Sequence, residues 1–283
     1  MNLLALDTST ERLCLALHAR GQWALHEEAG GAQASMRLLP AAQELLSQQR
    51  LRWADLQGLA FGQGPGAFTG LRGACAAVQG LALGLGIPAV AVPSLQLVAE
   101  DARQQALARG LFGAQAHCTV HVAVDARMGQ VYDDTLAWDG QRWCSRQGVS
   151  VRAPQEVARD WRAALVGARL EAGARAGFHH EPAVPSIRLM AGSGLPLLPA
   201  DEAQACRAST VLWAEAEVNR PLALGHGAWA AWEDGPRLDA AQVMPLYVRD
   251  RVAQTTAERE AQRMAAFQDR VPGTAAAASG APQ

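Results

Sequence analysis

The chain has 283 residues but no lysine, so every one of its 25 basic side chains is an arginine. This absence excludes a phosphate-binding lysine of the Walker A type, a Schiff-base lysine and a catalytic serine–lysine pair, which all need an amine. Charged residues make up only 18% of the chain and the net charge is −2, which argues against a strong electrostatic surface for nucleic acid. Hydrophobic residues reach 49%, enough for a large core in about two domains.

Cysteine is also scarce and is not arranged in pairs. There are five cysteines and no C-x-x-C spacing, which excludes a zinc or redox module and predicts reduced thiols. The segment Met1–Leu6 lacks a basic region and Asp7 interrupts its apolar run, so we expect no signal peptide and a cytoplasmic protein. Residues 73–99 carry no charge and could span a bilayer by length, but their glycines and prolines favour a buried helix followed by a strand.

Strand and helix patterns alternate along the first hundred residues. Three apolar segments separated by turns predict an antiparallel meander, and the segments after it alternate between helix and strand. The predicted strands are Leu3–Leu6, Leu13–His18, Trp23–His26, Leu56–Phe61 and Ala89–Val92. The predicted helices are Ser35–Gln48 with Ser35 as its cap, a helix capped near Thr69, and Ser94–Ala108. This order is typical of a mixed sheet covered by helices.

The opening pattern recurs later in the chain. A strand at Val120–Val124 ends at Asp125, and a second strand at Gln130–Ala137 precedes a glycine turn and a strand around Gln141–Trp143. The recurrence suggests a duplicated lobe, with coincidence as the alternative. Further along we expect strands at Ala163–Gly167 and Ile187–Gly194, with a loop at Arg169–Pro185 between them. The composition from residue 271 onward predicts a disordered tail.

A glycine-rich loop, residues 62–70, lies between a predicted strand and a predicted helix. Such a loop can place free N–H groups at a phosphate, but the acidic residue of a dinucleotide site is absent about 20 positions on. A tight structural turn is the alternative. The helix that follows carries small residues along one face, at Gly73, Ala77, Gly80 and Gly84. Because glycine destabilises a helix, we weigh two reasons for them: close packing within the domain, or a docking face for a partner helix.

Few residues suggest metal chemistry. Asp7 and Asp125 each follow an apolar strand, where carboxylates can bind a metal or polarise water, with a polar strand end as the alternative. His117 and His121 would be about 13 Å apart on a strand, which is too far for one ion. The pair His179 and His180 lies in a predicted loop and is given the same low weight as a metal site, and neither a G-x-S-x-G nor an H-E-x-x-H motif occurs.

Taken together, five segments resemble the TsaB (YeaZ-like) proteins of bacterial tRNA threonylcarbamoyladenosine synthesis. The matching segments are Leu4–Thr10, Leu38–Pro40, Gly62–Arg72, Asp125–Tyr132 and Pro245–Arg249. The resemblance implies an α/β, actin-like (ASKHA, ribonuclease H-like) fold of two lobes. We expect an N-terminal lobe at 1–108, completed by part of 205–250, a second lobe at 109–204 and an extension at 253–283.

The resemblance also implies a subunit without catalytic residues, metal or cofactor of its own. TsaD-like proteins hold a metal with two histidines, and the matching positions here are Ser94 and Val98, which cannot replace imidazole. ATP and metal are then expected on the partners, a TsaD-like catalytic subunit and a TsaE-like ATPase, with tRNA contacted only through the complex and no membrane contact. A homodimer in the absence of the TsaD-like subunit is kept as an alternative.

Two sets of residues follow from this resemblance. The expected partner interface lies on the first two long helices and comprises Leu38, Leu39, Ala42, Leu45, Gly73, Ala77 and Gly80. Loops at which a nucleotide could bind weakly comprise Asp7, Thr8, Ser9, Gly64 and Gly66. The family commonly has histidine where this chain has Ala34, and Arg169–Pro185 resembles an insertion. The competing hypothesis is an independent enzyme of the same fold, either metallopeptidase-like or a small-molecule kinase.

Overall fold

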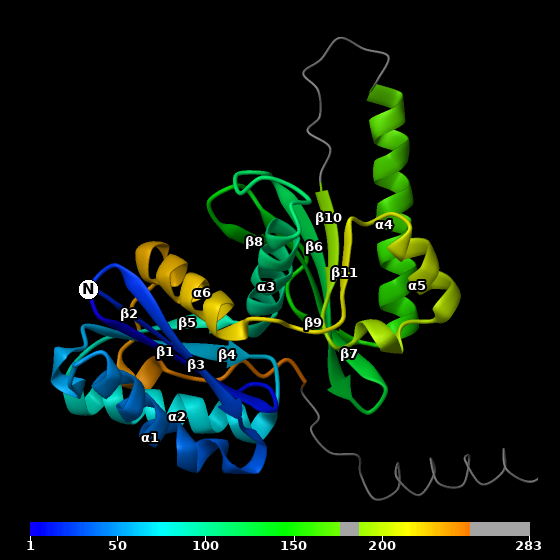
Figure 1. Cartoon of the computed structure of the whole chain (residues 1–283). Helices are drawn as coiled ribbons and strands as arrows, with labels where there is room; N and C mark the ends of the chain where they lie inside the picture. Colours follow the sequence, from blue (N-terminus) through cyan, green and yellow to red (C-terminus); the bar gives the residue numbers. More distant parts are fainter. Residues whose placement is uncertain (176–186, 250–283) are drawn as a thin grey trace, which may run out of the picture. The chain divides into compact units, whose positions relative to one another are not determined.

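The computed structural model describes residues 1–175 and 187–249, and residues 1–248 form one compact unit. The expected tail lies outside these described residues. Figure 1 shows two β-sheets with helices packed against them. The predicted α/β class and the actin-like arrangement of two sheets covered by helices are therefore confirmed.

The first sheet has the strand order β3-β2-β1-β4-β5. Its strands are β1 (Leu3–Asp7), β2 (Arg12–Ala19), β3 (Gln22–Ala29), β4 (Gly58–Gly64) and β5 (Ala89–Pro93). Strands β1, β2 and β3 form the predicted antiparallel meander, and β4 and β5 join it in parallel. All five predicted strands are thus confirmed.

Both faces of the first sheet are covered, which explains the uninterrupted apolar sequence of β1. Leu4 and Leu6 point into a core formed with α1 (Ala34–Gln48) and α2 (Phe68–Leu85). Leu3 and Ala5 point into a second core that includes α6 (Arg220–Asp234). The alternation along the strand follows from the pleat of the sheet.

The second sheet repeats the first. Its order is β11-β10-β6-β7-β8, with β9 paired to β7. Its strands are β6 (Cys118–Arg127), β7 (Gln130–Trp138), β8 (Trp143–Ser145), β9 (Ser150–Arg152), β10 (Ile187–Ala191) and β11 (Leu212–Ala214). As in the first sheet, two antiparallel pairs are followed by two parallel pairs. The hypothesis of a duplicated lobe is confirmed at the level of topology, whereas the lobe boundaries stay a prediction.

Helices also cover both faces of the second sheet. One face packs against α3 (Ser94–Ala108), and the other packs against α4 (Pro154–Arg175) and α5 (Ala200–Arg207). The strand predicted at Ala163–Gly167 is wrong, because these residues lie in the middle of α4. Val157, Trp161 and Leu165 recur at helical spacing and are buried together, a period that the short apolar segment did not reveal.

Three smaller predictions also need correction. The loop predicted at Arg169–Pro185 begins inside α4, which continues to Arg175, and residues 176–186 lie outside the described part of the chain. Ser35 does not cap α1, which starts one residue earlier after a short 3-10 turn. Likewise Thr69 is inside α2, whose N-terminal cap is Ala67 without a side-chain bond. All five cysteines are free thiols, as predicted.

Candidate functional site

Segments far apart in the sequence converge where β1 ends. Asp7 is the last residue of β1, and Ser9 follows it in the turn to β2. Ser94 opens α3, and its Oγ accepts a hydrogen bond from the Gly64 amide at 3.1 Å and donates one to Ser9 Oγ at 3.3 Å. Arg220 opens α6 and reaches the same point. The predicted loops therefore meet at one place, together with an arginine that the sequence did not single out.

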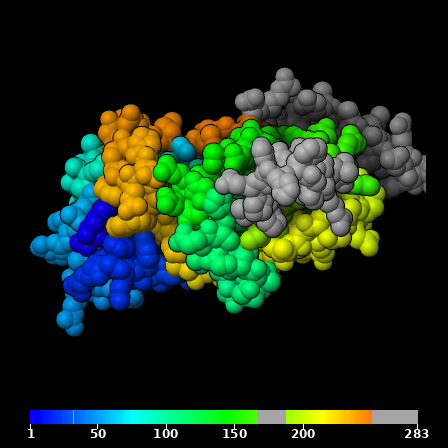
Figure 2. All heavy atoms as spheres, turned by 90° about the horizontal axis from the view of Figure 1, so that it is seen from above, coloured from blue at the N-terminus to red at the C-terminus, as the bar shows by residue number. Residues whose placement is uncertain are grey.

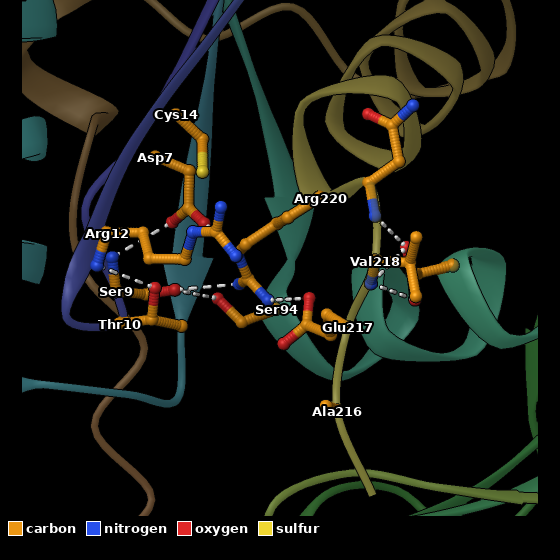
Figure 3. A network of polar contacts seen from close by, with 12 residues as sticks. Asp7, Ser9, Thr10, Arg12, Cys14, Ser94, Ala216, Glu217, Val218 and Arg220 are labelled. Carbon is orange, nitrogen blue, oxygen red and sulfur yellow. Dashed lines mark hydrogen bonds and ion pairs between the residues drawn. The ribbon is translucent and has the colours of Figure 1, made fainter. Parts of the chain in front are cut away.

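Arg220 fills this place with its guanidinium group, as Figure 3 shows. Its Nε donates to Asp7 Oδ2 at 2.6 Å and its Nη2 donates to Ser9 Oγ at 2.9 Å. Its Nη1 contacts Glu217. Both Arg220 and Asp7 are buried, with side chains only 2% and 1% exposed. A charge-assisted hydrogen bond of this kind is strong. It engages the Asp7 carboxylate, which a metal ion, either alone or bound to a phosphate, would need as a ligand.

The start of α6 is held by neighbouring residues. Asn219 caps the helix, because its side-chain oxygen accepts a hydrogen bond from the Leu222 amide at 3.2 Å. Asp101 on α3 accepts hydrogen bonds from the amides of Val218 at 3.1 Å and Asn219 at 2.7 Å. Two elements thus fix the backbone from which Arg220 extends.

The charge of Arg220 is met by two carboxyl groups inside the protein. Burial by itself lowers the pKa of Arg220, but the carboxylates of Asp7 and Glu217 outweigh it and raise the pKa above its usual range. The guanidinium is therefore charged throughout the working pH range. Burial raises the pKa of the adjacent Cys14 thiol, so that this group stays neutral.

The glycines of the loop allow the backbone to approach the residues after β1. A Cβ at position 62 would lie against Asp7 Oδ1, and one at position 66 would lie against the Ser9 carbonyl, both closer than real contacts allow. Thr8 donates from its hydroxyl to the Gly70 carbonyl at 2.7 Å. The loop was interpreted either as a phosphate site or as a tight structural turn. These close contacts between backbone segments are those of a tight structural turn.

The residues predicted for a nucleotide loop are thus neighbours. Asp7, Thr8, Ser9 and Gly64 make hydrogen bonds within the protein, and Gly66 lies against the backbone of Ser9. Arg220 was missed because its sequence context, between Asn219 and Pro221, is that of an ordinary helix start.

The second sheet has an equivalent turn. Strand β10 runs parallel to β6 as β4 does to β1, and it leads into Gly192, Ser193 and Gly194. Ser193 Oγ accepts a hydrogen bond from the Asp125 amide at 3.2 Å. This segment is therefore the counterpart of the first loop.

The predicted partner surface divides into buried and exposed residues. Leu38, Ala42 and Leu45 face the first sheet and are at most 3% exposed, so they support the helix from inside and cannot touch a partner. Leu39, on the next position, is 42% exposed. The expectation that Leu38, Ala42 and Leu45 lie at the partner surface is therefore corrected, because α1 turns these three side chains toward the core.

The exposed part of this surface is an apolar groove between α1 and α2, which we call the α1/α2 groove. It has a volume of about 550 Å³. Its lining residues are Leu39, Pro40, Gln43, Trp53, Gly80, Leu81, Gly84 and Leu85. A Cβ at Gly80 or Gly84 would meet no atom within 4 Å, whereas one at Gly73 would contact Ser35 at 3.5 Å. The distance at Gly73 is an ordinary van der Waals contact, so packing within the described chain requires glycine at none of these three positions.

Helix α2 is also the one described helix that is long and apolar enough to cross a membrane by length and composition. Leu71, Cys75 and Val78 on one side of it are buried against the first sheet. This is the packing of an amphipathic helix. The predicted helix is therefore present, but it buries one side only instead of being buried throughout.

Metal ligands do not gather elsewhere among the residues that the structure describes, where no group of three His, Cys, Asp or Glu side chains could hold an ion. His121 lies on β6, bonds to the Thr135 hydroxyl at 3.1 Å and packs on Trp161. Its burial lowers its pKa to about 4, so it is neutral. His117 lies outside the strand and is exposed.

The repeated sheets, the loop at the end of β1 and the helices around it define an α/β protein of the actin-like class. Residues 15–159 match the model of the family described as TsaD, tRNA N6-adenosine threonylcarbamoyltransferase. That match covers more than half of the chain.

Individual relatives agree. The chain is 36% identical over 147 residues to the tRNA threonylcarbamoyladenosine biosynthesis protein TsaB of Escherichia coli (strain K12), covering 50% of this chain and 60% of that protein. It is 37% identical over 132 residues to the TsaB protein of Haemophilus influenzae, covering 47% and 52%. YeaZ from Pseudomonas aeruginosa has a similar structure, with a TM-score of 0.64 and 28% identity over 87% of this chain and 99% of that one.

The chain therefore belongs to the TsaD family, and within it to the TsaB or YeaZ-like proteins, as its sequence motifs predicted. The matched segments span between about half and two thirds of the length of these curated relatives. Its relatives are named for the biosynthesis of tRNA threonylcarbamoyladenosine.

Proposed function

We propose that this chain is a non-catalytic subunit that binds and activates a TsaD-like catalytic subunit for threonylcarbamoylation of adenosine 37 in tRNA. In this proposal a TsaE-like ATPase completes the cytoplasmic complex, tRNA is contacted only through the complex, and ATP and metal belong to the partner subunits. The observation that carries the proposal is the buried contact between Arg220 and Asp7.

The contact supports a non-catalytic role for a chemical reason. Phosphoryl transfer and metal-assisted hydrolysis need a carboxylate that is free to hold a cation or a water molecule. Asp7 at the end of β1 is the carboxylate available for that work, and its Oδ2 is bound by a guanidinium at 2.6 Å. Ser94 and Val98, at the positions where TsaD-like proteins are expected to hold a metal, are buried and offer no imidazole.

The α1/α2 groove supports the partner role. Glycine at an exposed position of a helix destabilises the helix by about 1 kcal/mol relative to alanine. The presence of both Gly80 and Gly84 in one groove therefore calls for a functional reason. Absence of a side chain at Gly80 and Gly84 lets a second helix approach the backbone closely. Exposed Leu39 and half-buried Leu81 and Leu85 would then be covered by that helix.

Reconstitution tests the role. Unmodified tRNA, threonine, bicarbonate and ATP would be incubated with TsaC-, TsaD- and TsaE-like proteins, with and without this chain. We expect modified adenosine only when the chain is present. Equal modification of tRNA without this chain would contradict the proposed role. Turnover of ATP by the purified chain alone would favour the independent actin-fold enzyme instead.

One variant tests the surface. We expect Gly80→Leu to lose co-elution with the TsaD-like subunit and to abolish activity in the reconstituted mixture, while the melting temperature of the isolated chain does not fall. Gly113→Leu is the matched control, since a Cβ there also meets no atom within 4 Å but lies far from α2 in the sequence. Unchanged co-elution of the Gly80 variant would contradict the proposed surface. If the wild-type chain elutes as a homodimer when alone, the same variant shows whether that contact uses the groove.

A further inference from the structure

A second hollow lies away from the Arg220–Asp7 contact, at the opposite end of β1. His18, which lines it, pairs with Leu3 at the start of that strand, whereas Asp7 is at its end. The hollow, which we call the tryptophan pocket, has a volume of about 380 Å³. This is within the range of small-molecule sites, about 300–1,000 Å³. Figure 2 looks onto the surface where α6, in orange, borders the dark-blue N-terminal strands and the green second half of the fold.

The lining of the tryptophan pocket is rich in indole rings. It comprises His18, Trp23, Gln96, Glu100, Arg103, Trp138, Gln141, Trp143, His226, Gly227, Trp229, Ala230 and Glu233. Four of the eight tryptophans of the chain are therefore gathered here from β3, β7, β8 and α6. Indole rings attract a cation that lies over one of their faces.

The rings are held in position by polar side chains. Trp143 donates from its indole Nε1 to Glu100 at 3.0 Å. The His18 ring lies 5.0 Å from the Trp23 ring and 4.3 Å from the Trp229 ring, and its Nδ1 bonds to the Met1 carbonyl at 3.0 Å. Three of the four rings are thus fixed before a ligand enters, which reduces the entropy lost on binding.

One wall of the pocket already carries a cation on an indole face. The guanidinium carbon of Arg103 lies 4.3 Å from the centre of the Trp138 ring. The charge of this arginine is met by Glu100, which accepts two hydrogen bonds from it at 2.9 Å each. Glu100 also accepts from His226 at 2.8 Å, and its pKa is lowered to about 2: burial raises it, but the hydrogen bonds and the charge of Arg103 outweigh this.

A negative charge remains after this pairing. Glu233 lines the pocket and is exposed, and it makes no hydrogen bond or ion pair with any residue in the described ranges. With Arg103 and Glu100 paired with each other, the lining of the pocket combines neutral indole rings with the carboxylate of Glu233. This combination suits an organic cation better than a phosphate or a carboxylate ligand.

We propose that the tryptophan pocket binds an organic cation with an alkylated ammonium head group, which would be placed among the indole rings with Glu233 at the rim. The head group could belong to a free amine or to a methylated lysine side chain of a polypeptide. The chemistry recognised is the same in both cases. This site is separate from the α1/α2 groove and does not depend on the role proposed above.

Calorimetric titration of the full chain tests the site with two cations and one neutral compound. Choline stands for a free amine and N-acetyl-trimethyllysine methylamide for a side chain, and 3,3-dimethylbutan-1-ol has the shape of choline without its charge. We expect a dissociation constant of about 1 mM or tighter for one of the cations, and at least about tenfold weaker binding of the alcohol. The cation with the lower dissociation constant identifies the source of the head group, a free amine or a methylated lysine side chain. Absence of binding by both cations, or equal binding of the alcohol, would overturn the proposal.

Matched variants place the binding in this pocket. Glu233→Gln should weaken cation binding by about threefold to tenfold at low salt, because it removes the free carboxylate. Asp234→Asn makes the same charge change on the next residue, which does not line the pocket, and should leave binding unchanged. Shifts of the indole N–H signals of Trp143 on titration, followed by nuclear magnetic resonance, locate the ligand independently. Equal effects of the two variants, or unshifted indole signals, would also overturn the proposal.

Discussion

Arg220 and Asp7 are 213 positions apart in sequence, and their side chains meet at 2.6 Å in the interior of the protein. The contact joins the start of α6 to the end of β1, so it ties a late segment of the chain to the first strand. It also occupies the point where the glycine loop and the start of α3 converge. The same pair therefore contributes to stability and removes the free carboxylate from this loop.

Deleting one partner of this pair should be costly. Arg220→Met leaves the Asp7 carboxylate buried without its cation, and we expect it to lower the free energy of unfolding by about 3–5 kcal/mol. Arg207→Met removes an exposed ion pair with Glu215, and should cost less than about 1 kcal/mol. Urea unfolding measures both. The double variant Arg220→Met with Asp7→Asn should regain part of the loss, and a single-variant loss below about 1 kcal/mol would contradict the role assigned to the contact.

Two glycine-to-alanine substitutions should act in opposite directions. Gly62→Ala would press a methyl group against Asp7 Oδ1 and displace the carboxylate from Arg220, so we expect a large loss of stability, above about 3 kcal/mol. Gly80→Ala places its methyl group in open space on a helix and should stabilise the chain by about 0.5–1 kcal/mol. Thermal unfolding of the pair, made in the same background, checks the assignment. A loss of stability at position 80 would show that this position is packed.

Adjacent leucines on α1 separate the core from the partner surface. Leu38 is 1% exposed, so that Leu38→Ala should cost about 2–5 kcal/mol of stability. Leu39 is 42% exposed and lines the α1/α2 groove, so Leu39→Asp should change the stability little but weaken association with a TsaD-like subunit. Urea midpoints and co-elution would be measured on both. Full association of the Leu39 variant would move the interface away from this groove.

Local patterns predicted most of the fold. The five strands of the first sheet and β6, β7 and β10 of the second were predicted from their apolar segments, because helices cover both faces of each sheet. Strands β9 and β11 have three residues each and were not predicted. The duplicated order of strands followed from the same pattern. Helix α4 was partly misassigned because its short apolar segment, taken alone, does not distinguish a strand from a helix.

The sites were harder to predict because their residues come from distant segments. Glycines of the loop indicated where backbone approaches β1, but not that Arg220 would fill the space. The burial of Leu38 and exposure of Leu39 depend on how α1 is rotated against the sheet, which the apolar spacing alone did not decide. The tryptophan pocket combines indole rings from four elements, and no short sequence motif predicts it.

Burial of His121 should make stability depend on pH. Burial lowers its pKa from 6.5 to about 4, so the unfolded chain binds a proton at a higher pH than the folded chain does. Between these values the unfolded state holds more protons, and the free energy of unfolding should therefore fall as the pH decreases from about 6.5 to 4. The full effect of this one group would be on the order of 3 kcal/mol. Unfolding in urea at a series of pH values would show the decline.

His121→Leu should flatten this part of the profile, because leucine fills the space beside Trp161 and does not titrate. It also removes the hydrogen bond to the Thr135 hydroxyl, which should lower stability by about 1 kcal/mol at every pH rather than change the slope. His117→Gln, at an exposed position four residues earlier, should keep the wild-type slope. If the two variants have the same slope between pH 6.5 and 4, protonation of His121 is not what destabilises the fold in acid. The slope, rather than the absolute stability, separates the charge of the imidazole from its packing.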